Sequence, residues 1–474
     1  MAVDNFRFRW QNFRGFSDTG WFPIRKLNII IGPNNSGKSS LIAPLLLLKQ
    51  TWDSRDPDVP LVLHGDLLSV GSYKDLVWQH DISRRLTLSV DFVERPEDKE
   101  PPSLGDLPPT KFDLTFQERQ QSKPFIELYR YVAADGFDRV LIDRRKKRRG
   151  YSLLKYPQLI DAVMESGESP FSDFLKRNPE TDKFVDGDVP TNFLFDSGSV
   201  SFELRSRSHD DNEGGGTSFE LRPEPERSTY LELYRQIGLF TRHMFVNHLL
   251  RDLSYVGPLR QRPRRIYEVT QEIPMRVGHG GERTAELMYH HQNDAIQAAI
   301  DSWLKKFGLA DGIACDQIND TLFSLIVRTG EAHTNIADCG FGLSQILPLV
   351  VNGITLDDRT LMVAEQPEIH LNPKQQATLA DLFVSLAKDK TVLVETHSEH
   401  LLLRLRRLIA EKKIDAGDVA LLFVEKLDGE SKVREVPLRN DGSLSSDDWP
   451  SGFFEDSLEQ ALGLARAQSR GDSE

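Results

Sequence analysis

The sequence lacks the features of a membrane, secreted or metal-cluster protein. It contains two cysteines, Cys315 and Cys339, with no CxxC pair and no Cys/His cluster, which excludes a zinc site or a disulfide framework built on cysteine. No apolar run approaches the roughly 20 residues that cross a bilayer. The N-terminal residues lack the continuous apolar core of a secretory signal. We therefore expect a cytoplasmic protein that does not contact a membrane.

The sequence also lacks an excess of basic residues. Its 59 lysines and arginines are outnumbered by 72 acidic residues, which gives a formal net charge of −13. This balance argues against a surface that is basic throughout and binds duplex DNA. One basic run, residues 144–149, follows a strand-like stretch at 139–142. Two interpretations of this run stay open: a solvated hairpin tip, or a contact with nucleic-acid phosphates or an acidic partner surface.

The composition is that of an ordinary globular chain, and strand-like segments alternate with helix-like ones. With 474 residues, 39% hydrophobic and 28% charged, the chain is long enough for two or three domain-sized units. The predicted elements are strands at 27–31, 321–328, 360–364 and 391–395, and helices from about Gly37 and at 342–352, 374–388 and about 401–408. This alternation predicts an α/β fold whose mostly parallel sheet is covered by helices on both faces.

The strand predicted at 27–31 leads into a glycine-rich loop. Residues 32–39 read GPNNSGKS, which fits the pattern G-x-x-x-x-G-K-[ST] between a buried strand and a helix. The glycines let the backbone approach phosphate oxygens, and the amides at the helix start favour their negative charge. Lys38 would reach the β- and γ-phosphates, and the Ser39 hydroxyl would bind Mg²⁺. The candidate nucleotide-binding residues here are Gly32, Asn34, Asn35, Ser36, Gly37, Lys38, Ser39 and Ser40.

Two further apolar strands are followed by polar residues that fit the same chemistry. The strand at 361–365 ends in Glu365, which would lie beside the phosphate loop and Mg²⁺, and it continues as QPEIHLNP. The strand at 391–395 is followed by His397 one strand–helix–strand unit later. That spacing brings His397 to the same edge of the sheet, near a γ-phosphate. A lone histidine is usually structural, but the order of these motifs favours a functional one.

Together these segments resemble the ABC-type ATPases of the SMC, RecF and OLD (overcoming lysogenization defect) group within the AAA family. The opening NFRGF at 12–16, the NNSGKS loop and DCGFGLSQ at 338–345 are similar to that group's N-terminal, phosphate-loop and signature motifs. The resemblance implies an ABC-type P-loop ATPase head with a large α+β insertion and a small C-terminal extension. The expected division is 1–51 and 310–430 for the two lobes of the head, 52–309 for the insertion and lid region, and 431–474 for the extension.

The resemblance also implies a role for each motif. Glu365 matches the Walker B acid on the Mg²⁺ side, and His397 matches the switch histidine. In the signature stretch, Gly342, Ser344 and Gln345 would contact the γ-phosphate of ATP held by a second copy of the chain. ATP and Mg²⁺ are therefore the expected cofactors, and a homo-oligomer with ATP sandwiched between heads is the expected assembly.

One residue departs from the pattern of that group. The usual catalytic pair is an acid for Mg²⁺ followed by a glutamate that activates water, and here the second position is Gln366. An amide cannot accept the proton as a carboxylate does. Either Glu368 substitutes for it or turnover is slow and ATP mainly locks the dimer, and we expect slow hydrolysis.

Two other segments narrow the resemblance to bacterial single-head OLD-like ATPases. These are YVGPLR at 255–260 and the tail WPSGFF at 449–454, which resembles a C-terminal domain of unknown function. Many such relatives are found in anti-phage defence beside an effector, often a nuclease. The 77 residues after His397 (474 minus 397) are few for a fused nuclease domain and hold no clustered acidic metal motif. A nuclease or toxin activity is therefore expected in a separate protein.

We compare four functional hypotheses for this sequence. The leading hypothesis is an ATP-gated sensor or regulator that holds or releases a separate effector. A RecF-type DNA-repair ATPase that clamps duplex DNA is favoured by the basic run at 144–149 and disfavoured by the net charge of −13. An energy-coupling subunit of a transporter fits poorly with the large insertion and the atypical signature. A nearly non-hydrolysing ATP-gated scaffold is compatible with Gln366.

Overall fold

The computed structural model describes residues 6–54, 59–91, 111–118, 253–358 and 360–444 in full. It also describes the backbone of further strand residues at 92, 109–110, 125–133, 138–143, 151–152, 184–187 and 202–205. The basic run at 144–149 and the tail segment 449–454 lie outside the described residues. No helix in the described part of the chain is both long and apolar enough to span a membrane.

The chain divides into two compact units. Unit 1 comprises Met1–Asn5, Thr19–Ala43 and Asp252–Glu474, and unit 2 comprises Phe6–Asp18 and Pro44–Arg251. The division falls within helix α1 (Lys38–Asp53), after its first turns. The phosphate loop and all the other candidate site residues belong to unit 1.

Unit 1 contains a six-stranded sheet. Its strand order is β12 (Ser254–Val256), β17 (Leu361–Glu365), β18 (Thr391–Glu395), β4 (Leu27–Ile31), β19 (Val419–Leu427) and β20 (Glu430–Glu435). The first five strands are parallel, and β20 is antiparallel to β19. Every residue of β4 and β17 is buried, as expected for parallel strands that are covered on both faces. The predicted α/β fold with a mostly parallel sheet is confirmed.

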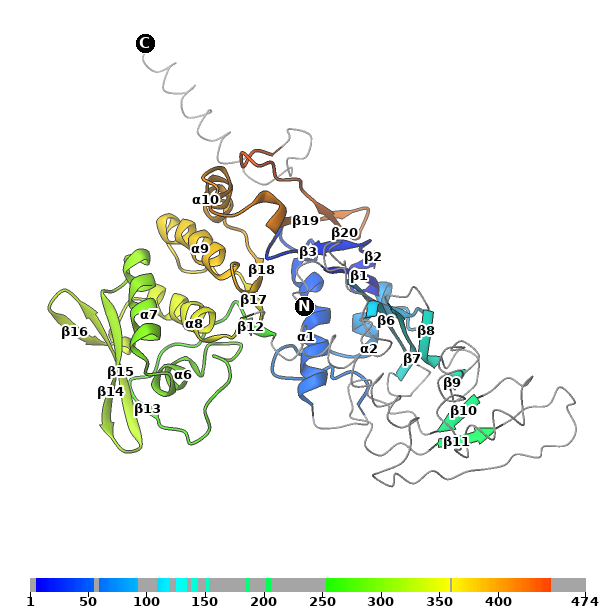
Figure 1. Ribbon diagram of the computed structural model, residues 1–474, viewed down its shortest axis with the longest axis horizontal. Helices are drawn as coiled ribbons and strands as arrows, with labels where there is room; N and C mark the ends of the chain where they lie inside the picture. Colours follow the sequence, from blue (N-terminus) through cyan, green and yellow to red (C-terminus); the bar gives the residue numbers. More distant parts are fainter. Residues whose placement is uncertain are drawn as a thin grey trace, which may run out of the picture. The chain divides into compact units, whose positions relative to one another are not determined.

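Three helices of unit 1 follow one another along this sheet: α8 (Phe341–Thr355), α9 (Pro373–Leu386) and α10 (Glu399–Ala410) (Figure 1). The start of α9 is fixed by a capping box. The Asn372 side chain accepts a hydrogen bond from the backbone N–H of Gln375, and the Gln375 side chain accepts one from the backbone N–H of Asn372. Ser398 caps α10 by accepting the amide of Leu401. These caps determine where each helix leaves the carboxyl edge of the sheet.

A second sheet belongs to the same unit. Its strands are β13 (Tyr267–Glu268), β15 (Leu322–Thr329), β14 (Gly312–Asn319) and β16 (Ala332–Asn335), all paired antiparallel. Helices α6 (Thr284–His290) and α7 (Asp294–Phe307) lie between β13 and β14 in the chain, and α7 packs on α8 and β14. The rings of Tyr267 and Tyr289 stack on Phe323 of β15. The short helix η4 (Ile336–Asp338) then leads directly into α8.

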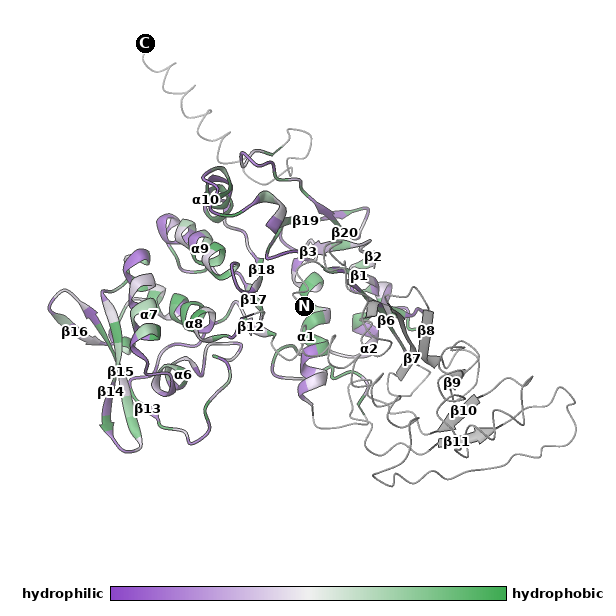
Figure 2. Cartoon of the chain, in the orientation of Figure 1, coloured by the Kyte–Doolittle hydropathy of each residue, from purple (hydrophilic) through white to green (hydrophobic). Residues whose placement is uncertain are grey.

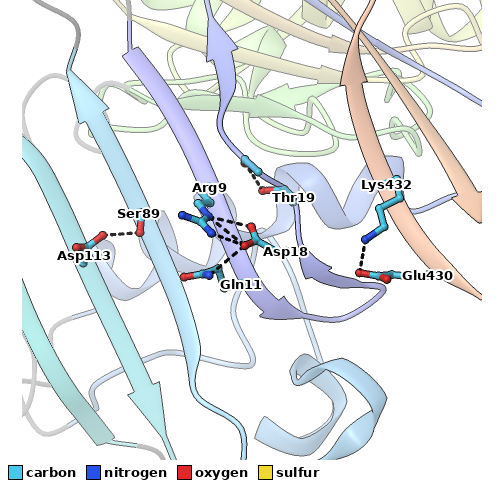
Figure 3. A network of polar contacts seen from close by, with 9 residues as sticks. Arg9, Gln11, Asp18, Thr19, Ser89, Asp113, Glu430 and Lys432 are labelled. Atoms are coloured by element: carbon cyan, nitrogen blue, oxygen red, sulfur yellow. Dashed lines mark hydrogen bonds and ion pairs between the residues drawn. The ribbon is translucent and has the colours of Figure 1, made fainter.

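Unit 2 is built on an antiparallel sheet. Its order is β2 (Phe16–Asp18), β1 (Phe6–Phe13), β5 (Leu86–Phe92), β6 (Pro109–Gln117), β7 (Phe125–Ala133) and β8 (Asp138–Asp143). Alternate residues of β1 are buried, and Arg9 between them pairs with Asp18 of β2 (Figure 3). Ser89 and Asp113 form a similar polar link between β5 and β6. The short elements of this unit are α2 (Tyr73–Leu76), η1 (Trp78–His80) and a small sheet of β9 (Tyr151–Ser152), β10 (Phe184–Gly187) and β11 (Phe202–Arg205).

Helix α1 connects the phosphate loop with unit 2. Its sequence KSSLIAPLLLLKQTWD carries a run of leucines that are all buried, and Figure 2 shows part of this helix in green. Pro44 lies inside the helix, and the helix continues through it to Asp53. Proline removes one backbone donor at this point, so the first turn, which carries the site residues, lacks one bond to the rest of the helix.

Candidate nucleotide-binding site

The phosphate loop lies between β4 and α1, at the carboxyl end of a central parallel strand. Gly32, Asn35 and Gly37 have φ angles of 148°, 60° and 110°. A Cβ atom on Gly32 would lie 2.0 Å from the carbonyl oxygen of Val424 in the neighbouring strand β19, so no side chain fits there. Asn34 and Asn35 at the tip are exposed to solvent. The local backbone therefore has the open turn that the glycine pattern predicts.

Lys38 is held against this loop. Its Nζ donates to the carbonyl oxygens of Gly32 at 3.1 Å and Pro33 at 2.7 Å, and its side chain is buried. Burial lowers the pKa of Lys38, and the negative charges of Glu395 and Glu368 oppose that change. The ammonium group thus donates to the loop and experiences the charges of Glu395, at the end of β18, and Glu368, in the turn after β17.

Ser39 contacts a carboxylate that the sequence motifs did not assign. Its Oγ donates to Oε1 of Glu395, the last residue of β18, at 3.1 Å. Glu395 is directly opposite Glu365 in the parallel register of β18 and β17. Burial raises the pKa of Glu395; the Ser39 hydrogen bond and the Lys38 charge act in the opposite direction, and the Glu368 charge adds to the increase. Two acidic residues therefore end adjacent strands beside the phosphate loop.

Glu365 and Gln366 mark the end of β17. The Glu365 carboxylate is buried and hydrogen-bonds the Tyr255 hydroxyl, whose pKa is raised by burial and by the charge of Glu365. Gln366 has a positive φ of 44°, which is unusual for a residue with a side chain. Its backbone N–H donates to the backbone carbonyl of Glu395 at 2.7 Å. This bond joins the two strand ends and turns the chain sharply after Glu365.

The Glu368 side chain is hydrogen-bonded to the backbone of His397. Oε1 of Glu368 accepts the amide of His397 at 2.6 Å, and its carboxylate is buried. Burial raises the pKa of Glu368, against the effect of its hydrogen bonds. Burial, together with the charge of Lys38, lowers the pKa of His397. The imidazole is therefore neutral at pH 7 and can donate one hydrogen bond and accept another.

Arg260 is a buried cation at the same edge of the sheet. Its Nη2 donates to the carbonyl oxygens of Glu365 at 3.1 Å and Gln366 at 3.3 Å. Within the described residues, its Nε and Nη1 have no hydrogen-bond partner. Burial lowers the pKa of Arg260 to about 10, and the Glu368 charge opposes this change, so the guanidinium remains charged at pH 7. Arg260 stabilises the turn after β17 through Nη2, and its Nε and Nη1 are available to bind a ligand.

The signature residues lie at the first turns of α8. Ser344 Oγ donates to the carbonyl of Phe341 at 2.7 Å, and Gln345 Nε2 lies 3.5 Å from that same hydroxyl. Both side chains are buried, and Gly342 is half-buried. These hydrogen bonds stay within α8 and connect none of the three residues to the phosphate loop among the described residues. Their contact with a nucleotide in a second copy stays a prediction.

The structure thus places most candidate residues that act within one copy of the chain at the carboxyl edge of the parallel sheet. Lys38, Ser39, Glu365, Gln366, Glu368 and His397 all lie at or just beyond the carboxyl ends of β4, β17 and β18. Sequence reasoning missed Glu395, Arg260 and Tyr255 as members of this cluster. The signal for Glu395 was available, because TVLVE at 391–395 is an apolar strand that ends in an acid, like LMVAE at 361–365.

The residues present fit ATP and Mg²⁺. Several buried polar atoms lack a hydrogen-bond partner in the described part of the chain: Ser36 Oγ, Glu368 Oε2, Glu395 Oε2 and two nitrogens of Arg260. Carboxylate and hydroxyl oxygens suit Mg²⁺, while amides, lysine and arginine suit phosphate oxygens. A parallel sheet with a glycine loop, a buried lysine and strand-end acids defines the class of P-loop nucleotide-binding folds.

Comparison with family models gives a more specific assignment. Residues 27–404 match the family described as AAA domain, putative AbiEii toxin, type IV TA system. The chain belongs to this AAA-domain family, which confirms the AAA-type membership expected from the motifs. Residues 414–464 match a separate model for a protein of unknown function, which agrees with the resemblance of the tail at 449–454 to such a domain. No curated protein is similar enough to this chain to be matched.

Several solved structures match this chain at low sequence identity. An Smc head bound to the C-winged helix domain of ScpA is 12% identical with a TM-score of 0.41, over 91% of this chain and 97% of that chain. An Smc head with an extended coiled coil, bound to the C-terminal domain of ScpA and derived from Pyrococcus furiosus, is 13% identical with a TM-score of 0.41, over 98% of each chain. An SMC head domain from Thermotoga maritima is 10% identical with a TM-score of 0.34, over 91% of this chain and 98% of that chain.

Proposed function

We propose that this chain is a cytoplasmic ATPase that binds ATP and Mg²⁺ at the carboxyl edge of β4, β18 and β17 and hydrolyses ATP slowly. The observation that supports this proposal best is the buried Lys38, which donates to the phosphate loop while the charges of Glu395 and Glu368 act on it. A buried ammonium that donates to the loop carbonyls and experiences the charges of two acidic residues is well placed to bind a polyphosphate.

In this proposal each residue has a defined task. The backbone N–H groups of the loop after Pro33 and the Lys38 side chain bind the phosphate oxygens, and Ser39 and Glu365 would hold Mg²⁺, which neutralises phosphate charge when bound. His397, neutral at pH 7, donates a hydrogen bond towards the γ-phosphate. The pairing of its backbone amide with Glu368 fixes its position relative to β17.

The proposed cellular role is that of a sensor or regulator of a separate effector protein, in anti-phage defence. ATP would close two heads, with Gly342, Ser344 and Gln345 of one copy facing the nucleotide of the other. The signature turn at the start of α8 carries the exposed ring of Phe341, so this turn is accessible to a second copy. Binding of ATP across two copies makes the affinity between heads depend on nucleotide, which is the property a regulator needs.

The decisive experiment is ATP binding by the Lys38→Ala variant. We expect the variant to lose at least a hundredfold in ATP affinity by calorimetry, because a charge-assisted contact to the β- and γ-phosphates is removed. The exposed Lys374, at the start of α9, provides the matched control, and Lys374→Ala should bind as the wild type does. Unchanged ATP affinity in Lys38→Ala would rule out this site as the phosphate cradle.

A further inference from the structure

Two carboxylates end adjacent strands at the proposed site, and the resemblance to known ATPases assigns a metal role to one of them. Glu365 and Glu395 are direct partners in the parallel register of β17 and β18. Glu395 is 2% exposed, more deeply buried than Glu365 at 8%. An isolated buried carboxylate is costly unless it is paired or coordinates a ligand, so the two oxygens of Glu395 require an explanation.

One oxygen of Glu395 is explained by the chain itself. Oε1 accepts the hydrogen bond of Ser39 Oγ at 3.1 Å, which links the end of β18 to the first turn of α1. A serine hydroxyl has a single proton and two lone pairs. When its proton points to Glu395, the lone pairs point elsewhere, which is the orientation a metal-binding hydroxyl needs. Glu395 therefore controls the direction of the Ser39 hydroxyl.

The other oxygen of Glu395 is not explained by the chain. Oε2 has no hydrogen-bond partner among the described residues, although the side chain is almost fully buried. Because Oε1 contacts the phosphate-loop helix, the carboxylate points to the nucleotide site. A purely structural carboxylate that only ties β18 to α1 would leave Oε2 desolvated without compensation, at a cost of roughly 1–3 kcal/mol or more.

We propose that Glu395 is a positioning residue for the magnesium ion of MgATP: Oε1 orients the Ser39 hydroxyl, and Oε2 provides a second carboxylate oxygen to the metal beside Glu365. This inference rests on the proposed function, since it concerns the metal of the same site. It predicts that a negative charge at position 395 favours the metal complex of ATP and disfavours ATP alone.

The experiment separates metal binding from nucleotide binding. The affinity of the protein for the non-hydrolysable analogue adenylyl imidodiphosphate is measured by calorimetry with excess EDTA, and the Mg²⁺ affinity is then measured with the analogue at saturation. In Glu395→Gln, which keeps the shape and an oxygen for Ser39, Mg²⁺ should bind 10- to 100-fold more weakly. The metal-free analogue should bind as tightly as in the wild type or more tightly, because a negative charge near the phosphates is lost.

Two further variants make the result unambiguous. Glu331→Gln alters an exposed glutamate in the turn between β15 and β16 and should leave both affinities unchanged. Glu395→Asp keeps the charge, and it should bind Mg²⁺ more tightly than Glu395→Gln does even if both variants lower the melting temperature. A role in packing alone would instead weaken the binding of the analogue equally with and without Mg²⁺.

The outcomes distinguish this inference from the function on which it rests. If the wild type binds the analogue with Mg²⁺ and Glu395→Gln shows wild-type Mg²⁺ affinity, the role of Glu395 is wrong and the nucleotide site stands. If Glu395→Asp and Glu395→Gln lose Mg²⁺ to the same extent, the charge at 395 is not what matters and the inference also fails. If the wild type binds no analogue at all, the proposed function itself is wrong.

Discussion

At the scale of single residues, we expect Gln366 to limit the turnover rate of the proposed ATPase. It follows Glu365 directly, and its positive φ of 44° turns the chain at the end of β17. The nearby carboxylate of Glu368 is buried, and one of its oxygens already accepts a hydrogen bond from the backbone N–H of His397. An amide at 366 leaves no free base at the position where a carboxylate would activate water.

Gln366→Glu should therefore increase turnover. We expect a rise of tenfold or more in the rate of phosphate release, because general-base catalysis typically contributes 10²- to 10⁴-fold. The matched control is Gln317→Glu, an exposed residue in β14 that should have no effect. Unchanged turnover in Gln366→Glu, combined with its loss in Glu368→Gln, would show that Glu368 is the base.

A second residue-scale feature concerns stability rather than chemistry. Asp381 of α9 accepts bonds from Arg404 of α10 at 2.8 and 2.9 Å and lies 3.4 Å from Lys306 of α7. Burial alone would raise the pKa of Asp381, but the bonds and charges of the two cations outweigh burial and lower it. Asp381 therefore connects three helices of unit 1 through a carboxylate that stays ionised in mildly acidic solution.

This lowered pKa predicts a specific acid dependence. The stabilisation from Asp381 is fully present above the ordinary carboxyl pKa near 4 and is lost as the pH falls through the lowered pKa in the folded state. Asp381→Asn should cost about 1–3 kcal/mol of unfolding free energy at pH 7. The difference between wild type and variant should shrink as the pH falls below about 4 in urea titrations. A constant difference across that range would contradict the assignment.

At the scale of elements, the sequence predicted the central strands well. Strands β4 and β18 coincide with the predictions at 27–31 and 391–395, because fully buried strands are continuous apolar runs bounded by polar turns. The predicted helices at 342–352 and 374–388 correspond to α8 and α9 within a few residues. Local composition alone is enough for elements of this kind.

Other elements were not predictable in the same way. Strand β12 has three residues, too few for a periodic signal, and most of β14 is exposed, so neither has an apolar pattern to detect. The order of the strands cannot be predicted from local patterns, because β4 pairs with strands far along the chain. The same limit applies to the site: the loop motif identifies Lys38 and Ser39, whereas the proximity of Glu395 and Arg260 emerges only from strand pairing and packing.

The close approach of α8 to α9 gives an element-scale prediction. A Cβ atom on Gly353 of α8 would lie 2.5 Å from Cδ1 of Leu386 in α9, so the two helices are in contact at a position that tolerates only glycine without rearrangement. Gly353→Ala should cost about 1–3 kcal/mol through overpacking, partly offset by the better helix propensity of alanine, about 1 kcal/mol. The measurement is a chemical denaturation series.

Gly417 in η5 (Ala416–Asp418) serves as the control for that substitution. An added Cβ there meets nothing within 4 Å among the described residues, so Gly417→Ala should change the unfolding free energy by less than about 0.5 kcal/mol. If Gly353→Ala proved as neutral as the control, Leu386 would have room to move and the two helices would pack more loosely than described.

At the scale of the whole molecule, the proposed head pairing makes assembly depend on ATP. Ser344→Arg should leave ATP binding intact but prevent nucleotide-dependent dimerisation, measured by light scattering with and without the non-hydrolysable analogue. Because Ser344 is 6% exposed, Gly342→Glu at the half-buried start of α8 is the second variant, and melting temperatures verify the fold of both. Ser83→Arg, at an exposed turn of unit 2, should dimerise normally. A normal ATP-dependent dimer in both signature variants would exclude a shared site.

The net charge of −13 gives the other prediction at this scale. We expect duplex DNA to bind more weakly than about 10⁻⁵ M at physiological salt, because few phosphates can be neutralised by this surface. Fluorescence anisotropy with ATP present, at 50 and 200 mM salt, tests it. A RecF-type clamp would show tight binding with a steep salt dependence, and that result would favour DNA repair over the regulation of an effector.

The parallel pairing of β4 has a consequence for how the chain is made. Asn28 of β4 hydrogen-bonds the carbonyl of Val392, 364 residues later, and β4 pairs with both β18 and β19. At roughly 5–20 residues per second, translation takes about 20–70 s to supply those neighbours. During that interval the apolar segment LNIII emerges from the ribosome with both of its edges bare. An apolar strand with unpaired edges can pair with other chains, so we expect this segment of the nascent protein to need protection until β18 and β19 have been made.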